Sequence, residues 1–247
     1  MIASLMMYAR PELDAENTAY WAVLRDSFGA RGINTPETMD NTRDEFEVWL
    51  SPDLVFSQTC GLPYRATLAE QVTLIGTANY ALEGCPAGYY NSVVLVRADD
   101  PRERVGAYAD AQFVFNQDCS QSGYGAAYLW ARDHGFWFSD RQASGAHTQS
   151  ARMVAQGEAD IAVVDAQTWR FIQRFDSFAK DLRVIDRTVP TPGLAYISAK
   201  GADADLMFDA VAEAIENLDP AHRTSLCLEG IVKVPQAAYL AVENPPV

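Results

Sequence analysis

The residues best suited to chemistry lie between positions 116 and 124, where a polar segment follows an expected strand (113–115) and opens an expected helix (about 124–133). Ser120 and Ser122 supply hydroxyl donors on either side of Gln121, and Gly123 follows them. The first N–H groups of a helix have no intrahelical partner, and that end of the helix is electropositive. Such a loop can hold a phosphate, phosphonate, sulfonate or carboxylate without lysine or arginine. The alternative is that either serine only caps the helix.

Two further polar segments lie where the pattern again changes after a strand. His147 stands in the segment 144–150, at the start of an expected helix (148–156), and could donate to an oxyanion and gain charge there. Ser57, Gln58 and Thr59 leave an apolar strand expected at 54–56. The alternatives are a structural hydrogen-bonding role for the histidine and a turn with solvated side chains at 57–59.

The four cysteines show neither a CxxC pair nor a Cys/His spacing typical of a metal site, so we expect no metal ligands among them. Cys60 and Cys85 both lie in turn-like loops after strand-like segments. We expect their Cα atoms to be within disulfide range, about 5.5–6 Å apart. Such a bridge would contribute about 3 kcal/mol in the chain-entropy treatment. Two reduced thiols are the alternative, and Cys119 and Cys227 are expected to be buried thiols.

Short apolar segments that alternate with amphipathic ones must position these loops. Strands are expected at 2–7, 54–56, 72–76, 92–97, 113–115, 159–165 and 182–186. One helix is expected from Pro11 to at least Phe28, and another ends near position 50. Further helices are expected at 124–133, 148–156 and 202–217. This alternation predicts a parallel α/β architecture. In such folds, ligands bind in the loops beyond the carboxyl ends of the strands.

The charge of the chain argues against a polyanionic partner. Its 33 acidic and 19 basic residues give a net charge of −14, and no polybasic segment is present. Such a surface repels nucleic acid and anionic membranes at long range. The segment 92–188 is nearly neutral, with 13 acidic and 11 basic residues, whereas the rest of the chain has 20 and 8. The loops at 116–124 and 144–150 thus lie in the part of the chain with the weakest negative charge.

An enzyme would need a nucleophile with a base, or a pair of acid–base carboxylates. His147, Asp165 and a serine or cysteine could form a hydrolase-like set. The sequence, however, has no Gly-x-Ser-x-Gly elbow, no P-loop and no dinucleotide-binding glycine fingerprint. We therefore expect no catalytic residue, no cofactor and no enzymatic activity. No stretch reaches the roughly 18 apolar residues of a membrane span, so we expect no direct membrane insertion.

Six segments, in the same order, resemble the substrate-binding components of phosphate/phosphonate-type ABC transporters, within the class II periplasmic-binding-protein superfamily. They are residues 5–12, 57–61, 88–92, 120–124, 144–150 and 157–165, and the likeness covers nearly the whole chain. It implies a type II fold of two α/β lobes joined by two crossover segments, near 90–93 and 187–190. Lobe one would comprise 1–91 plus 189–247, and lobe two 92–188. The ligand would lie in a cleft between lobes that close by hinge motion.

The resemblance also implies which residues contact the ligand. The family's serine-rich helix start matches Ser120, Gln121 and Ser122, and its histidine matches His147. The other matches are Asp165, which would meet the amine of an aminophosphonate, and Tyr8, Ser57, Gln58, Thr59 and Tyr90 (or Tyr89). Two departures bear on the ligand. Gln121 replaces the central member of the serine cluster, and Thr191 begins a Thr-Pro-Gly segment where phosphonate binders have an acidic residue.

The implied function is that of a solute-binding protein that holds a phosphonate, phosphate ester or related oxyanion for ABC-type uptake. A permease would be its partner and the periplasm its compartment. The N-terminus lacks the basic flank of a secretory signal, so either the signal was removed or the chain is cytoplasmic. A binder of a cationic or heteroaromatic ligand, such as a thiamine precursor or a quaternary amine, is the alternative. The five tryptophans, eleven tyrosines and acidic charge favour that reading.

Overall fold

The computed structural model describes residues 1–246, which form two compact units. Unit 1 comprises Met1–Tyr89 and Pro192–Ala241, and unit 2 comprises Tyr90–Thr191 together with the residues from Val242 onward. The inner limits fall a few residues from those expected at 91 and 188. The C-terminal end differs from the expectation, which placed it in lobe one. In this segment, Glu243 Oε2 lies 2.6 Å from Arg132 Nη1 of unit 2.

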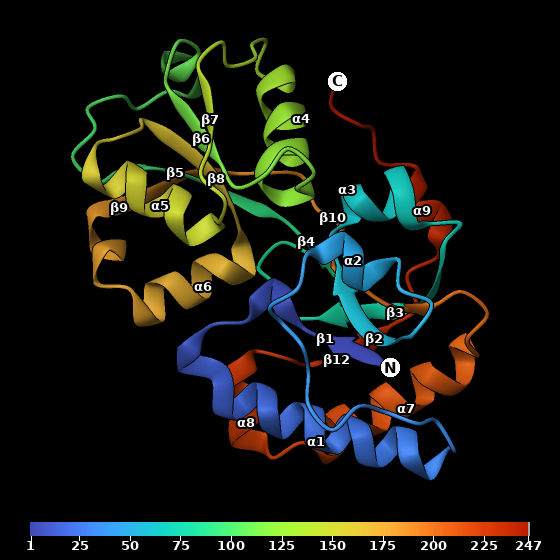
Figure 1. Ribbon diagram of the computed structural model, residues 1–247. Coiled ribbons are helices and arrows are strands. Elements are labelled where there is room, and N and C mark those ends of the chain that lie inside the picture. Colours follow the sequence, from blue (N-terminus) through green and yellow to red (C-terminus); the bar gives the residue numbers. More distant parts are fainter. Residues whose placement is uncertain (247) are drawn as a thin grey trace. The chain divides into compact units, whose positions relative to one another are not determined.

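Unit 1 is built on a mixed five-stranded sheet. Its strands, in spatial order, are β1 (Ile2–Ser4), β2 (Leu54–Thr59), β11 (Ala195–Ala199), β3 (Val72–Asn79) and β12 (Gly230–Val232) (Figure 1). β1 and β2 are parallel, whereas β11 is antiparallel to both β2 and β3, and β12 is antiparallel to β3. β1, β2 and β3 therefore run in one direction and end at the same edge of the sheet.

Helices cover both faces of the unit 1 sheet (Figure 1). One face carries α1 (Asp14–Ala30), α7 (Ala204–Asn217) and α8 (Pro220–Leu226), and the other carries α2 (Glu45–Trp49), α3 (Gly61–Pro63) and α9 (Gln236–Leu240). A 3₁₀ turn at Pro11–Leu13 leads into α1, whose buried Tyr20, Trp21, Leu24 and Phe28 recur at helical spacing, as predicted. The remaining helical turns of the unit are η1 (Met6–Tyr8) and η3 (Tyr64–Leu68).

Unit 2 contains a second mixed sheet of five strands. In spatial order they are β7 (Arg141–Ala143), β6 (Phe113–Phe115), β8 (Ile161–Asp165), β5 (Ser92–Arg97) and β9 (Leu182–Arg187). β6 is parallel to both β7 and β8, whereas β5 is antiparallel to both β8 and β9. The expectation of parallel sheets is therefore wrong in both units. β5 and β11 each enter their sheet directly after the chain crosses between units, without the crossover helix that a parallel connection needs.

The unit 2 sheet is also covered on both faces. α5 (His147–Gln156) and α6 (Ala166–Phe175) lie on one side, and α4 (Ala126–Asp133) lies on the other (Figure 1). Trp130 of α4 packs into a core with Phe113, Val94 and Val163. Residues 93–96 of β5 form a continuous apolar run, and all four are fully buried, as expected for a strand covered on both faces. Shorter helical turns are η4 (Val105–Tyr108), η5 (Gln121–Gly125) and η6 (Ser177–Asp181).

The chain passes from one unit to the other in two short strands, β4 (Tyr89–Tyr90) and β10 (Thr191–Pro192). They pair with each other as a two-stranded sheet, next to the crossover segments expected at 90–93 and 187–190. Among residues 1–246, no helix combines the length and the apolar character that crossing a membrane requires.

Candidate functional site

Three parallel strands of unit 2 end at one edge of its sheet, and each leads to a candidate binding residue. Ser120 and Ser122 follow β6, His147 follows β7, and Asp165 is the last residue of β8. Since β6 is parallel to both neighbours, their carboxyl ends share that edge. The structure thus brings together three polar loops that are separated in the sequence, and each of them opens a helix.

The serine loop opens a helix that begins with the π-helical turn η5 and continues as α4. Ser120 is its N-cap, because Ser120 Oγ accepts a hydrogen bond from the N–H of Gly123 at 3.0 Å. Ser122 is buried as well, and its Oγ lies 3.5 Å from Ser120 Oγ. Capping was the alternative role for both serines, and only Ser120 adopts it. Ser122 sits in the first turn, where a main-chain N–H has no intrahelical acceptor.

His147 is the first residue of α5, and its Nε2 atom lies 2.8 Å from Ser122 Oγ. Burial lowers the pKa of His147 to about 4, because an imidazolium in this position would lose its hydration. The ring is therefore neutral at pH 7 in the unliganded protein, and a gain of charge beside a bound anion stays a prediction. A neutral imidazole carries one N–H. Either His147 Nε2 therefore donates to Ser122 Oγ, or Ser122 Oγ donates to His147 Nε2.

Asp165 is a helix cap at the same edge of the sheet. Its Oδ1 accepts hydrogen bonds from the N–H groups of Gln167, at 2.7 Å, and Thr168, at 2.9 Å. The N-terminus of α6 thereby stabilises the buried carboxylate. Ser92 links this group to the serine loop, because it pairs with Asp165 across β5 and β8 and its Oγ donates to Ser122 O at 2.9 Å. Sequence reasoning did not identify Ser92, although it begins the most β-like segment of the chain. An ammonium contact at Asp165 stays a prediction.

Gln121, which replaces the central serine of the family pattern, is buried, and its side chain lies against Gly125, one turn further along its own helix. A Cβ atom at Gly125 would stand only 3.0 Å from Gln121 Oε1. The side chain therefore packs over the first turn. Its contact with a ligand stays a prediction.

The unit 1 candidates gather at the shared carboxyl edge of β1, β2 and β3. Ser57, Gln58 and Thr59 are buried and form the end of β2, which runs three residues further than expected, so the alternative of a solvated turn is wrong. Gln58 Nε2 donates to Tyr80 OH at 3.2 Å, and the ring of Tyr8 packs edge-on against Tyr80 at 5.2 Å between centroids. Sequence reasoning missed Tyr80. Its place directly after β3 is the signal that could have identified it.

The other sequence candidates have varied surroundings. Ser57 Oγ is buried and has no hydrogen-bond partner within residues 1–246, whereas Thr59 Oγ1 donates to Cys60 O at 3.4 Å. Tyr90 is buried in β4, and Thr191 is half-buried in β10. Ligand contacts by these four residues stay predictions.

The predicted disulfide is absent. The structure contains all four cysteines as thiols, and Cys119 and Cys227, which were expected to be buried, are half-buried. Cys60 is buried directly after β2, whereas the Cys85 thiol is half-buried and approaches Glu83 O at 3.7 Å. β2 extends to Thr59, so Cys60 lies directly between this strand and α3, as the N-cap residue of the helix. Within residues 1–246, no three His, Cys, Asp or Glu side chains gather as metal ligands would.

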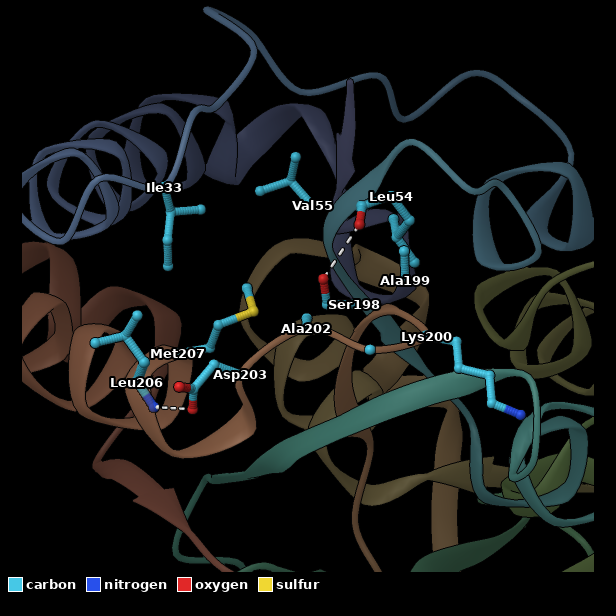
Figure 2. A pocket seen from close by; sticks show the side chains of 11 residues that line it. Ile33, Leu54, Val55, Ser198, Ala199, Lys200, Ala202, Asp203, Leu206 and Met207 are labelled. Carbon is cyan, nitrogen blue, oxygen red and sulfur yellow. Dashed lines mark hydrogen bonds between the residues drawn. The ribbon is translucent and has the colours of Figure 1, made fainter.

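A separate pocket of about 400 Å³ lies in unit 1 at the start of α7 (Figure 2). Its walls are mainly apolar, with Ile33 and Met207 among them. Its polar groups are engaged within the protein: Ser198 Oγ donates to Leu54 O at 3.1 Å, and Asp203 caps α7 (Figure 2). This pocket suits an apolar group rather than an anion.

Comparisons with known proteins identify the family and the fold. Residues 57–238 match the family described as the phosphonate periplasmic substrate-binding protein of ABC transporters. A search of curated proteins gave no match. The chain is similar to a solved Prochlorococcus marinus protein in complex with methylphosphonate, at 13% identity and a TM-score of 0.76, with 97% of this chain and 94% of that one covered.

Two further solved structures share the fold. A Xanthomonas citri protein bound to ATP has 14% identity and a TM-score of 0.70, with 96% of this chain and 91% of that one covered. A binding protein component of an ABC phosphonate transporter from Pseudomonas aeruginosa has 14% identity and a TM-score of 0.65, with 97% and 82% covered. These likenesses confirm the predicted type II periplasmic-binding-protein fold.

Proposed function

The chain belongs to the family of periplasmic phosphonate-binding proteins of ABC transporters, and we propose that it binds a small phosphonate or phosphate ester at the serine loop of unit 2. The observation that carries the proposal is the pair of buried hydroxyls, Ser120 and Ser122, at a helix N-terminus. The neutral ring of His147 forms a hydrogen bond with the hydroxyl of Ser122. Hydroxyl and main-chain N–H donors of this kind match the oxygens of a tetrahedral oxyanion.

The electrostatics of the chain favour this mode of binding. A protein with a net charge of −14 does not attract an anion by its overall field. Ser120, Ser122 and neutral His147 bring no charge of their own, so the helix dipole and the hydrogen-bond donors must stabilise the ligand. The nearby Asp165 carboxylate is already held by two main-chain N–H groups of α6, which reduces its repulsion of an anion.

The ligands of the two proteins solved in complex support the class of ligand. Methylphosphonate and ATP differ in size, but both carry phosphorus-bound oxygens. We therefore propose a phosphonate or phosphate group as the part of the ligand that the serine loop recognises.

The alternative of a cationic or heteroaromatic ligand is not favoured. It drew on the number of aromatic residues, yet Trp21, Trp49, Trp130 and Trp169 are all buried. The fifth, Trp137, packs against aromatic neighbours of unit 2 within the residues that form its core. The tryptophans are thus accounted for by packing.

Family membership also supports the rest of the proposal. We propose that the protein works in the periplasm, delivers its ligand to an ABC permease and performs no chemistry on it. The site suits binding because Ser122 lies at a helix start, where the helix dipole stabilises negative charge on a ligand. His147 contacts the hydroxyl of this serine.

A thermal-shift screen tests the proposal. Methylphosphonate, a phosphate monoester, inorganic phosphate, a sulfonate and choline are each added at up to about 100 times the expected Kd, where binding stabilises by about 2.7 kcal/mol. We expect a rise in Tm with a phosphonate or phosphate ester and none with choline. A rise with choline alone would contradict the oxyanion proposal.

A further inference from the structure

The two crossover segments are joined to each other at their unit 1 ends. Gly88 precedes β4, by which the chain leaves unit 1, and Gly193 follows β10, by which it returns. The N–H of Gly193 donates to Gly88 O at 2.8 Å. The N–H of Gly88 in turn donates to the side chain of Asn79, the last residue of β3, at 3.4 Å. Both segments are therefore tied to the unit 1 sheet at one junction.

Glycine is required at both positions of this junction because the main chain lies close to its neighbours. Gly88 has a φ of +75°, and a Cβ atom there would stand 2.2 Å from Val232 Cγ2 of β12. A Cβ atom on Gly193 would stand 3.0 Å from Gly88 O and 3.2 Å from Thr77 Cγ2 of β3. The two segments thus approach β3 and β12 closely.

A buried hydroxyl of the helix α9 holds the same junction. Tyr239 is 1% exposed, and its OH lies 2.9 Å from Gly193 O. A carbonyl oxygen only accepts, so the single hydroxyl proton of Tyr239 is donated to Gly193. Thr77 Oγ1, 2.6 Å away, then donates to the hydroxyl oxygen of Tyr239. Burial raises the pKa of Tyr239 above its ordinary value, so this hydroxyl remains a donor at neutral pH.

The opposite ends of the two segments are fixed within unit 2. Thr188 N–H donates to Ser92 O, and Ser92 N–H donates to Thr188 Oγ1, both at 2.9 Å. Between the two junctions lie residues 89–91 and 189–192. Two residues of the second stretch are prolines, whose rings fix φ. The chain between the junctions therefore has few dihedral angles that can turn.

We propose that Tyr239 is a positioning residue for ligand binding, whose hydroxyl fixes the junction at Gly88 and Gly193 and so confines the bending between the units to residues 89–91 and 189–192. A hinge with few soft dihedral angles moves along a defined path, so a larger fraction of the molecules is set for closure before the ligand binds. The consequence for affinity rests on the proposed function. The junction itself is a property of the unliganded protein.

Hydrogen–deuterium exchange followed by NMR tests the junction without ligand. Tyr239→Phe keeps the ring, which packs against Tyr64 at 5.0 Å between centroids, and removes only the hydroxyl. The amide of Gly193 should be protected in the wild type. In Tyr239→Phe it should exchange about tenfold faster relative to the amides of β3, because one buried hydrogen bond of the junction is lost. A Gly193 amide that exchanges fast in the wild type, or equally slowly in the variant, would overturn the proposal.

Calorimetry with methylphosphonate tests the consequence for binding. In Tyr239→Phe fewer molecules should have their crossover segments set for closure, and the Kd should rise in inverse proportion, by about 2- to 10-fold. An unchanged Kd in this variant would assign Tyr239 a merely structural role and overturn the proposal.

Ser198→Ala serves as the matched control. It also removes a hydroxyl donor from a buried main-chain carbonyl of unit 1, that of Leu54. It should lower Tm and leave both the exchange of Gly193 and the Kd unchanged, and an equal rise of the Kd in this control would contradict the specific role of Tyr239. If the wild type does not bind methylphosphonate, the proposed function fails, while the exchange of Gly193 still decides whether Tyr239 fixes the junction.

Discussion

Ser122→Ala should separate ligand binding from fold stability. Ser122 does not cap its helix, and its hydroxyl lies 2.8 Å from His147 Nε2 at a helix start. A hydroxyl that donates to a charged acceptor contributes about 1.5–3 kcal/mol, so the Kd for methylphosphonate should rise about 10- to 150-fold. Ser120→Ala should weaken binding too. It should also lower the free energy of unfolding by about 1 kcal/mol, because it removes the N-cap bond to Gly123.

Isothermal titration calorimetry with methylphosphonate and urea unfolding measure the two quantities. Ser198→Ala is the matched control, since it removes a buried serine hydrogen bond in unit 1, to Leu54 O. It should reduce stability and leave the Kd unchanged. Wild-type affinity in Ser122→Ala, or an equal loss of affinity in Ser198→Ala, would refute the assignment of the serine loop as the site.

Four further results follow from the same geometry. Burial lowers the pKa of His147 to about 4 from an ordinary 6.5. Between these two values the unfolded chain binds a proton at this histidine, whereas the folded chain does not. The wild type should therefore lose up to about 3 kcal/mol of stability between pH 6.5 and pH 4, and His147→Gln should lack this loss in urea titrations. Gly123→Ala should lower Tm and abolish binding, because the added Cβ would collide with the side-chain amide oxygen of Asn116. Asp165→Ala should cost about 1 kcal/mol in urea unfolding through loss of the α6 cap, and an unchanged value would contradict the capping role. A reducing agent should leave Tm unchanged, because Cys60 and Cys85 form no disulfide.

Local sequence pattern predicted the elements that carry the site. The apolar segment 92–97 is a strand of the same limits in the structure, and the helix after Pro11 buries the predicted Tyr20, Trp21, Leu24 and Phe28. The serine loop was predicted to open a helix after a strand, and it does. These features depend on periodicity and on helix-start residues, which a single sequence displays.

Features that depend on distant contacts could not be predicted in this way. Strand direction is set by pairing, and the antiparallel β5 and β11 follow from their entry at the crossing points. The ion pair between Arg132 and Glu243 joins residues 111 positions apart. Tyr80 becomes a candidate only when the fold places it beside Gln58. The sequence pattern at this position was compatible with an ordinary loop.

A crystal structure of the protein with methylphosphonate tests the central claim most directly. We expect a phosphonate oxygen within about 2.5–3.0 Å of Ser122 Oγ, the distance of a hydroxyl donor to a charged oxygen. Ser120 and the first N–H groups of the helix should bind the other oxygens. A phosphonate bound elsewhere, with the hydroxyls of Ser120 and Ser122 still hydrogen-bonded only within the protein, would contradict the claim.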